Sequence, residues 1–143
     1  MTISTAESCT GGTIASMLTS VPGSSEYFLG GVVSYCNEVK QQILGVSKDD
    51  LDKYGAVSRP VVEQMALGVK NLMQTDCAVA TSGIAGPGGG TAQKPVGTVW
   101  IAAVAGDRIV SKCFHFGNER SGNIRCSAET ALLMLYELLH SGS

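Results

Sequence analysis

The sequence has few basic residues, which argues against several functions. Only 10 of its 143 residues are Lys or Arg, and the formal net charge is −2. These residues form no cluster suited to the phosphate backbone of a nucleic acid. No apolar run approaches the roughly 20 residues of a membrane span, and we expect no signal peptide. We therefore expect a cytoplasmic protein whose partners include neither a nucleic acid nor a membrane.

The sequence also lacks the patterns of metal and disulfide sites. Its five cysteines are odd in number and widely spaced, and no Cys-x-x-Cys pair occurs. Neither a zinc site nor a disulfide framework is indicated, so reduced thiols are the simplest interpretation. Only two histidines are present, His115 and His140. The sequence therefore offers little material for a catalytic site built around histidine.

The residues that are present fit one domain over residues 1–143. Apolar residues make up 44% of the chain and charged residues 15%, enough to bury a core. Extended patterns occur at 3–6, 29–36, 77–81, 96–105 and 108–116. Helical patterns alternate with the first three of these segments, and the last two are predicted to form a hairpin. This order predicts an α/β fold, a three-layer α/β/α sandwich with a mixed β-sheet.

The stretch from Thr5 to Gly12 joins the first predicted strand to the first predicted helix. Its two glycines allow tight backbone geometry and close approach of a ligand, and the start of the following helix would attract an anion. A serine held there, Ser8, could be a nucleophile with oxyanion donors beside it. The simpler interpretation is that Ser8 or Thr10 only caps the helix.

Three further stretches carry side chains suited to chemistry. In residues 34–40, Tyr35 and Lys40 could face one crevice where a strand passes into a helix. Residues 81–90 form a glycine-rich loop after a buried strand, and their N–H groups could bind an anion. In residues 116–125, an arginine at a helix start could hold a phosphate. Each has a simpler interpretation: a solvated lysine, a flexible loop and a surface salt bridge.

Five motifs occur in order along the chain. They are Ala6-Glu7-Ser8-Cys9-Thr10-Gly11-Gly12, Tyr35-x-Asn37-Glu38-x-Lys40, Gly55-Ala56-Val57-Ser58, Ser82-Gly83-Ile84-Ala85-Gly86-Pro87-x-Gly89-Gly90 and Lys94-Pro95-Val96-Gly97-Thr98-Val99. Together they closely resemble the C-terminal domain of the CinA competence/damage-inducible proteins, over nearly the whole chain. Stand-alone versions of that domain are nicotinamide mononucleotide deamidases. The resemblance implies an α/β/α enzyme that hydrolyses this mononucleotide to nicotinate mononucleotide and ammonia, in pyridine nucleotide recycling.

The resemblance also implies roles for individual residues. Ser8 would be the nucleophile, Lys40 its base, and Tyr35 would assist or orient. The implied contacts with the mononucleotide substrate come from Cys9, Thr10, Gly11, Gly12, Ser82, Gly83, Gly86 and Arg120. The arginine spacing departs from the family pattern, so Arg125 is an alternative for the substrate phosphate. Family members use no metal, we expect no cofactor, and they form homodimers or higher oligomers.

The proposed base must be uncharged to accept a proton. The ordinary lysine pKa is about 10.4, and lowering it to near 7–8 takes roughly 3 units, or about 4 kcal/mol. Burial, or the cationic ring of the substrate, could supply this. Two alternatives stay open: a non-catalytic module that binds a mononucleotide phosphate, and an enzyme that uses Cys9 as nucleophile because thiols are intrinsically better nucleophiles.

The start of the chain differs from the family pattern. Family members usually have an amphipathic helix before the first motif, and here only seven residues precede Ser8. Either a sheet face is open, or a partner chain covers it, or the chain is incomplete. We therefore expect self-association through an uncovered apolar surface.

Overall fold

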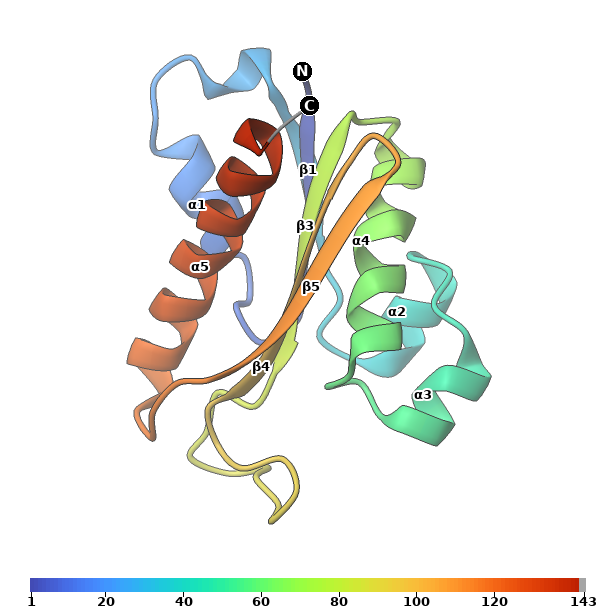
Figure 1. Cartoon of the computed structure of the whole chain (residues 1–143), viewed down its shortest axis with the longest axis vertical. Helices are drawn as coiled ribbons and strands as arrows, with labels where there is room; N and C mark the ends of the chain where they lie inside the picture. The colour runs from blue at the N-terminus through green and yellow to red at the C-terminus, as the bar shows by residue number, and fades with distance from the viewer. Residues whose placement is uncertain (142–143) are drawn as a thin grey trace.

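A mixed five-stranded sheet forms the centre of the computed structural model, which describes residues 1–141 (Figure 1). The strand order is β2-β1-β3-β4-β5. Strand β1 pairs in parallel with β2 and β3, whereas β3–β4 and β4–β5 are antiparallel. This confirms the predicted mixed sheet. The strands are β1 (Ile3–Glu7), β2 (Phe28–Val33), β3 (Cys77–Gly83), β4 (Thr98–Ala105) and β5 (Arg108–His115).

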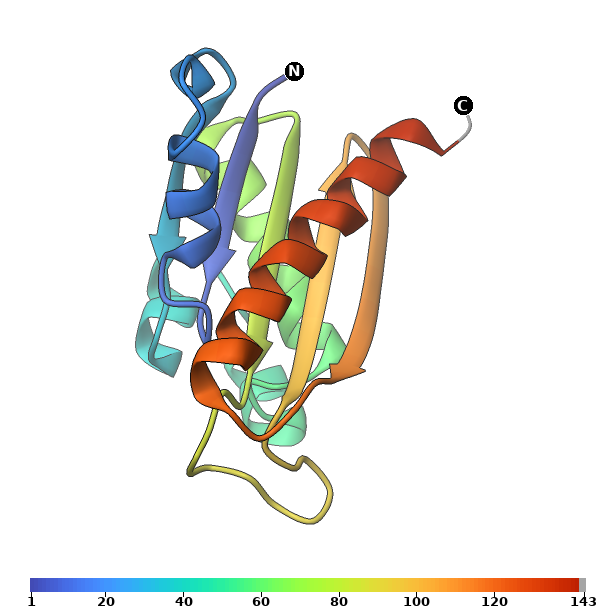
Figure 2. The ribbon, with the colours of Figure 1, turned by 90° about the vertical axis from the view of Figure 1, so that its left-hand side faces the viewer.

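Helices cover both faces of this sheet, as the three-layer prediction required. Helices α1 and α5 lie on one face and α2, α3 and α4 on the other (Figures 1 and 2). Each face has its own apolar core. None of the helices in residues 1–141 is long and apolar enough to cross a membrane. The helices are α1 (Thr13–Thr19), the 3₁₀ turn η1 (Ser24–Glu26), α2 (Asn37–Gln42), α3 (Lys48–Tyr54), α4 (Arg59–Met73) and α5 (Arg120–His140).

The inner strands follow from their composition. Because helices cover both faces, β3 and β4 are runs of small and branched apolar residues that are buried along almost their whole length. Strand β2 lies at an edge and alternates between half-buried and exposed residues. The predicted strand at 29–36 is too long at its end, because β2 stops at Val33. Tyr35 thereby leaves the sheet and can contribute to a site.

The three parallel strands end at the same edge of the sheet. Glu7, near the end of β1, is paired with Val33 on one side and with Thr81 on the other. Residues that follow these strands therefore gather there, as ligand-binding residues do in open α/β sheets. The same edge also receives the loop 84–97 and the start of α5 (Figure 2).

Candidate active site

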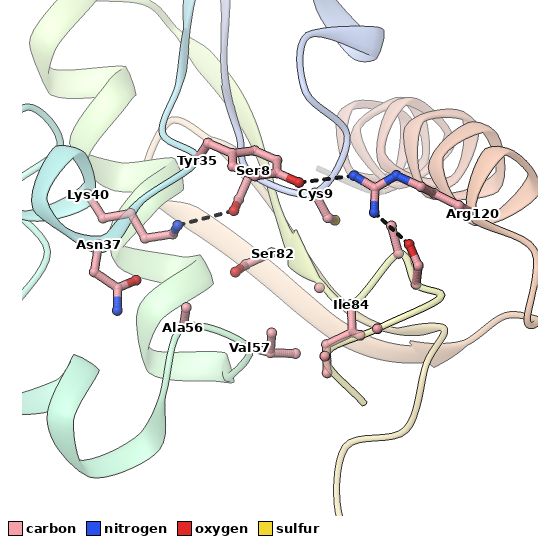
Figure 3. Close-up of a pocket in the computed structure, with 15 residues that line it drawn as sticks. Ser8, Cys9, Tyr35, Asn37, Lys40, Ala56, Val57, Ser82, Ile84 and Arg120 are labelled. Carbon is pink, nitrogen blue, oxygen red and sulfur yellow. Dashed lines mark hydrogen bonds between the residues drawn. The ribbon is translucent and has the colours of Figure 1, made fainter. Parts of the chain in front are cut away.

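A cavity of about 290 Å³ lies at this edge. Among residues 1–141, the basic residues that line it are Lys40 and Arg120, and no carboxylate lines it. A cationic arginine with no carboxylate beside it suits an anionic ligand. The lining comes from four of the five sequence motifs and the start of α5 (Figure 3): Ser8, Cys9, Tyr35, Asn37, Lys40, Ala56, Val57, Ser82, Gly83, Ile84, Ala85, Gly86, Gly88, Gly89 and Arg120.

Ser8 and Lys40 meet inside the cavity. Lys40 Nζ lies 3.1 Å from Ser8 Oγ (Figure 3). It also donates to the carbonyl oxygen of Ser34 at 2.7 Å. The lysine side chain is 1% exposed, and within residues 1–141 it forms no ion pair. Burial lowers the pKa of Lys40 below its ordinary value. An uncharged amine that donates to Ser34 has a lone pair left for the hydroxyl proton of Ser8.

The backbone on both sides of this pair is fixed by extensions of the sheet ladder. The N–H of Ser8 donates to Thr81 O at 3.1 Å, and the N–H of Ser34 donates to Glu7 O at 2.7 Å. Lys40 lies in the first turns of α2, which starts soon after the chain leaves β2. Ser8 directly follows β1, and Lys40 lies on the helix that follows the neighbouring strand β2, which gives the pair a defined separation.

Glu7 has a structural role that the sequence analysis did not identify. Its Oε1 accepts from the N–H of Ile14 at 2.9 Å and from Thr10 Oγ1 at 2.5 Å, and its Oε2 accepts from the N–H of Ala15 at 3.0 Å. The buried carboxylate therefore caps α1 from outside the helix. The prediction that this helix start attracts an anionic ligand is wrong, because the protein's own carboxylate occupies it. So is the capping role considered for Ser8.

Thr10, Gly11 and Gly12 are expected ligand contacts that the structure does not bring to the cavity lining. Thr10 Oγ1 points at Glu7 and at Thr81 Oγ1, 2.8 Å away, and is buried. Gly11 and Gly12 have φ values of 57° and 102°, which L side chains rarely adopt. These three residues build the turn that places Ser8 at the cavity.

Cys9 does line the cavity, but its thiol is poorly suited to attack. Burial is the largest influence on it and raises the pKa of Cys9 to about 11. The thiolate, which is the nucleophilic form, is therefore scarce at neutral pH. The arrangement favours Ser8 over Cys9 as the nucleophile.

Arg120 crosses the rim of the cavity opposite Lys40. Its Nη1 donates to Gly86 O at 2.6 Å and its Nη2 donates to Tyr35 Oη at 3.0 Å (Figure 3). Tyr35 is 61% exposed, and its hydroxyl contacts Arg120. Arg125 lies elsewhere on α5, exposed and 3.7 Å from Glu129. Of the two arginines, only Arg120 lines the cavity.

The end of β3, where the glycine-rich stretch 81–90 begins, supplies one polar group that has no protein partner within residues 1–141. Ser82 Oγ is buried at the cavity and makes no hydrogen bond within residues 1–141. A buried hydroxyl without a partner is costly, so it is available to a ligand. Gly83 and Gly86 also line the cavity; a Cβ on either would lie 2.5–2.6 Å from the Val99 or Val96 side chain. The lack of a side chain lets Gly83, at the end of β3, pack against Val99 of β4, and lets Gly86 pack against Val96 at the other end of the loop.

Asn123 is a second residue that the sequence analysis missed. It is 2% exposed, and its Nδ2 donates to Ala85 O and Gly117 O, both at 3.0 Å, while its Oδ1 accepts from Gly117 N at 2.8 Å. The amide therefore joins the glycine loop to the start of α5, where Arg120 lies. An asparagine within a predicted helix carries no sequence signal for this role.

Comparisons with known proteins show the family to which the chain belongs. The model of the CinA C-terminal domain matches residues 1–139. A CinA-like protein of Trichormus variabilis is 53% identical over 137 residues, which is 94% of this chain and 33% of that protein. One from Gloeothece citriformis is 61% identical over 100 residues, 70% of this chain and 24% of that protein. The chain thus spans about a third or less of these curated relatives.

Solved structures agree over almost the full chain. The competence/damage-inducible protein CihA of Agrobacterium tumefaciens has a TM-score of 0.96 at 43% identity, covering 98% of this chain and 86% of that one. A CinA superfamily protein of Escherichia coli has a TM-score of 0.93 at 33% identity, covering 96% and 80%. The fold and site define an α/β protein with a buried serine–lysine pair at the ends of its parallel strands. The chain belongs to the family of CinA C-terminal domains.

Proposed function

We propose that the chain is an amidohydrolase that converts nicotinamide mononucleotide to nicotinate mononucleotide and ammonia. The observation that carries this proposal is the 3.1 Å contact between Lys40 Nζ and Ser8 Oγ in the cavity. A serine hydroxyl needs a base to become a good nucleophile. A buried lysine whose pKa is lowered can be that base. The choice of substrate rests on the resemblance to deamidases of this family, and the place of the reaction would be pyridine nucleotide recycling.

The proposed reaction has two halves that share one base. Ser8 Oγ attacks the amide carbon while Lys40 takes its proton, and Lys40 then protonates the departing nitrogen, which leaves as ammonia. Water next attacks the acyl group on Ser8, its proton passes to Lys40, and Lys40 returns a proton to Ser8 Oγ. The carboxylic acid formed loses its proton to the released ammonia, so the sum is amide plus water to carboxylate plus ammonium. Lys40 acts as base and as acid in each half.

The remaining lining residues would bind and orient the substrate. Arg120 is a cation at the rim and can pair with the phosphate through donors not used on Gly86 and Tyr35. Tyr35 acts through Arg120 in this proposal, because its hydroxyl contacts that guanidinium. The unpartnered hydroxyl of Ser82 is available to the amide or ribose end. Gly83 and Gly86 would approach the substrate through backbone.

An ammonia-release assay on the purified chain tests the proposal. With nicotinamide mononucleotide as substrate, we expect ammonia and nicotinate mononucleotide in equal amounts. Binding of the mononucleotide without release of ammonia would contradict the enzyme and support the non-catalytic module instead. A sensor of that kind needs neither Ser8 nor Lys40.

Nicotinamide riboside, which lacks the phosphate, should be a much poorer substrate. Losing a charge-assisted pair with Arg120 removes about 1.5–3 kcal/mol, or roughly tenfold to a hundredfold in kcat/KM. Steady-state kinetics on the two compounds measure this difference. The exposed Arg125→Ala variant should discriminate as the unmodified chain does, whereas Arg120→Ala should not. Equal turnover of both compounds by the unmodified chain would refute the phosphate role of Arg120.

We also propose that the chain associates with itself through strand β2. This strand is an edge of the sheet, and Leu29 and Val33 on it are half exposed. An unpaired edge with apolar side chains is a template for pairing. Sedimentation at micromolar concentration should show a dimer or larger species, and Val33→Lys should shift it toward monomer. A clean monomer of the unmodified chain would count against this surface.

A further inference from the structure

Lys94 links two walls of the cavity that are far apart in the sequence. Its Nζ donates to the carbonyl oxygen of Tyr54 at 2.7 Å, across 40 residues. Tyr54 is the last residue of α3, and Ala56 and Val57 just after it form one wall. Lys94 belongs to the loop 84–97, whose glycines form the facing wall. Within residues 1–141 no other hydrogen bond joins this loop to α3 or to the turn after it.

The backbone of Lys94 is fixed before its side chain reaches across. Its N–H donates to Thr91 Oγ1 at 3.0 Å, and its carbonyl accepts from Thr91 N at 2.9 Å. The next residue, Pro95, has a restricted φ. The turn from Thr91 to Lys94 is therefore ordered. The hydrogen bond of the Lys94 ammonium to Tyr54 O consequently fixes the position of this turn, and of the loop 84–97 that contains it, relative to α3.

The receiving end is shaped to hold an ammonium group. Tyr54 O is one of the carbonyls left over at the end of α3, where a cation is favoured. Gly55 follows with φ at 79°, and a Cβ there would lie 3.2 Å from Lys94 Nζ. Gly55 therefore provides both the left-handed turn and the space above it. Lys94 forms no ion pair within residues 1–141, so this carbonyl is its principal polar contact.

We infer that Lys94 is a positioning residue that holds the glycine loop against the end of α3 and so sets the gap in which the substrate binds. The glycines at 88 and 89 have no side chains with which to fix themselves on the cavity. Without the link, the loop would sample wider openings, and the competent arrangement would be less populated. A lower population of that arrangement weakens apparent binding by the same factor. The kinetic consequence rests on the proposed amidase activity, whereas the effect on the loop does not.

Lys94→Met tests this inference, because it keeps the length of the side chain and removes its donors. We expect KM to rise roughly threefold to tenfold, with kcat changing less than about twofold. Lys94→Arg, which restores a cationic donor, should recover most of the loss. Lys48→Met is the matched control, because Lys48 is exposed on α3, the helix that ends at Tyr54, and within residues 1–141 its only ion pair is with Asp52. It should behave as the unmodified chain does.

A measurement on the loop itself separates this inference from the proposed function. Backbone ¹⁵N relaxation should show lower order parameters for Gly88 and Gly89 in Lys94→Met, and unchanged values in the Lys48→Met control. Unchanged order parameters in Lys94→Met would overturn the inference, whatever the activity. A more mobile loop with unaltered affinity would overturn it too, because the link would not set the gap. If the unmodified chain released no ammonia, calorimetric binding of nicotinate mononucleotide would replace KM, and the amidase proposal alone would fail.

Discussion

Replacing Ser8 or Lys40 with alanine should reduce turnover of nicotinamide mononucleotide by about a thousandfold or more. The two side chains meet at 3.1 Å and are assigned to one proton transfer. Since neither side chain can perform this step without the other, the double variant should turn over substrate almost as fast as either single variant. Substrate binding should largely survive in Ser8→Ala, because the hydroxyl acts mainly in the transition state. Single-turnover kinetics and calorimetric binding measure both parts.

Controls can separate lost chemistry from a damaged fold. Lys40→Met fills the buried space without an amine, and it should be as inactive as Lys40→Ala while unfolding at the same denaturant concentration as the unmodified chain. Lys40→Arg should also fail, because a guanidinium stays protonated and cannot accept the serine proton. Ser16→Ala, at an exposed position on α1, should keep full activity. Near-normal turnover in Lys40→Arg would sink the mechanism, and so would full additivity of the two alanine changes.

The same assignment fixes the direction of the pH dependence. Lys40 must be uncharged to act, and burial lowers its pKa below the ordinary value. Below that lowered pKa the amine is protonated and turnover falls; above it the amine is free and turnover reaches a plateau. The rising limb should therefore lie below the ordinary lysine pKa, and it should disappear from the residual activity of Lys40→Met.

Much of this arrangement was predictable because it depends on strand order and residue type. Ligands gather beyond the carboxyl ends of parallel strands, so the glycine-rich stretch 81–90, which follows a buried strand, was expected to contribute to a site. The pair Ser8 and Lys40 came from the family resemblance, with the physical requirement that a lysine base be desolvated. Both of these residues line the cavity, and Lys40 is buried.

The choice between the two arginines needed the exact start of α5. Arg120 is the first residue of that helix, and Arg125 is five residues later. At 100° per residue the two side chains are about 140° apart around the axis, so they cannot serve one site. A shift of the helix start by two or three residues, within the usual uncertainty of a sequence-based boundary, changes which one faces the cavity.

The roles of Glu7 and Asn123 were out of reach for a related reason. Glu7 is bonded to N–H groups seven and eight residues further along, and Asn123 is bonded to a loop 38 residues away. Neither distance matches a local motif such as a capping box, in which the partners are three residues apart. Such contacts exist only once the turn after β1 and the packing of α5 have formed.

Glu7→Ala should lower the free energy of unfolding by about 3 kcal/mol, because the N–H groups of Ile14 and Ala15 lose their acceptor and the Thr10 hydroxyl is left with Thr81 Oγ1 alone. The carboxylate is 1% exposed and accepts from the N–H groups of Ile14 and Ala15 and from the hydroxyl of Thr10. No other acceptor is bonded to either N–H within residues 1–141. Since whole domains are stable by only about 5–15 kcal/mol, this loss is large. Urea unfolding followed by circular dichroism measures it.

Glu7→Gln separates the contribution of the negative charge of Glu7 to the free energy of unfolding from the contribution of its size and shape. The amide oxygen still accepts from one N–H, but the amide nitrogen faces donors and the charge that favours the start of α1 is gone, so a loss of about 1–2 kcal/mol is expected. Glu129→Ala removes a carboxylate from an exposed i,i+4 pair and should cost less than about 0.5 kcal/mol. If Glu7→Ala lowered the free energy of unfolding by less than about 0.5 kcal/mol, water would be accepting from the N–H groups at the start of α1. The turn that carries Ser8 would then not depend on this carboxylate. If the loss is as large as expected, Glu7 secures the turn, and the position of Ser8 is set by a neighbouring group that does not line the cavity.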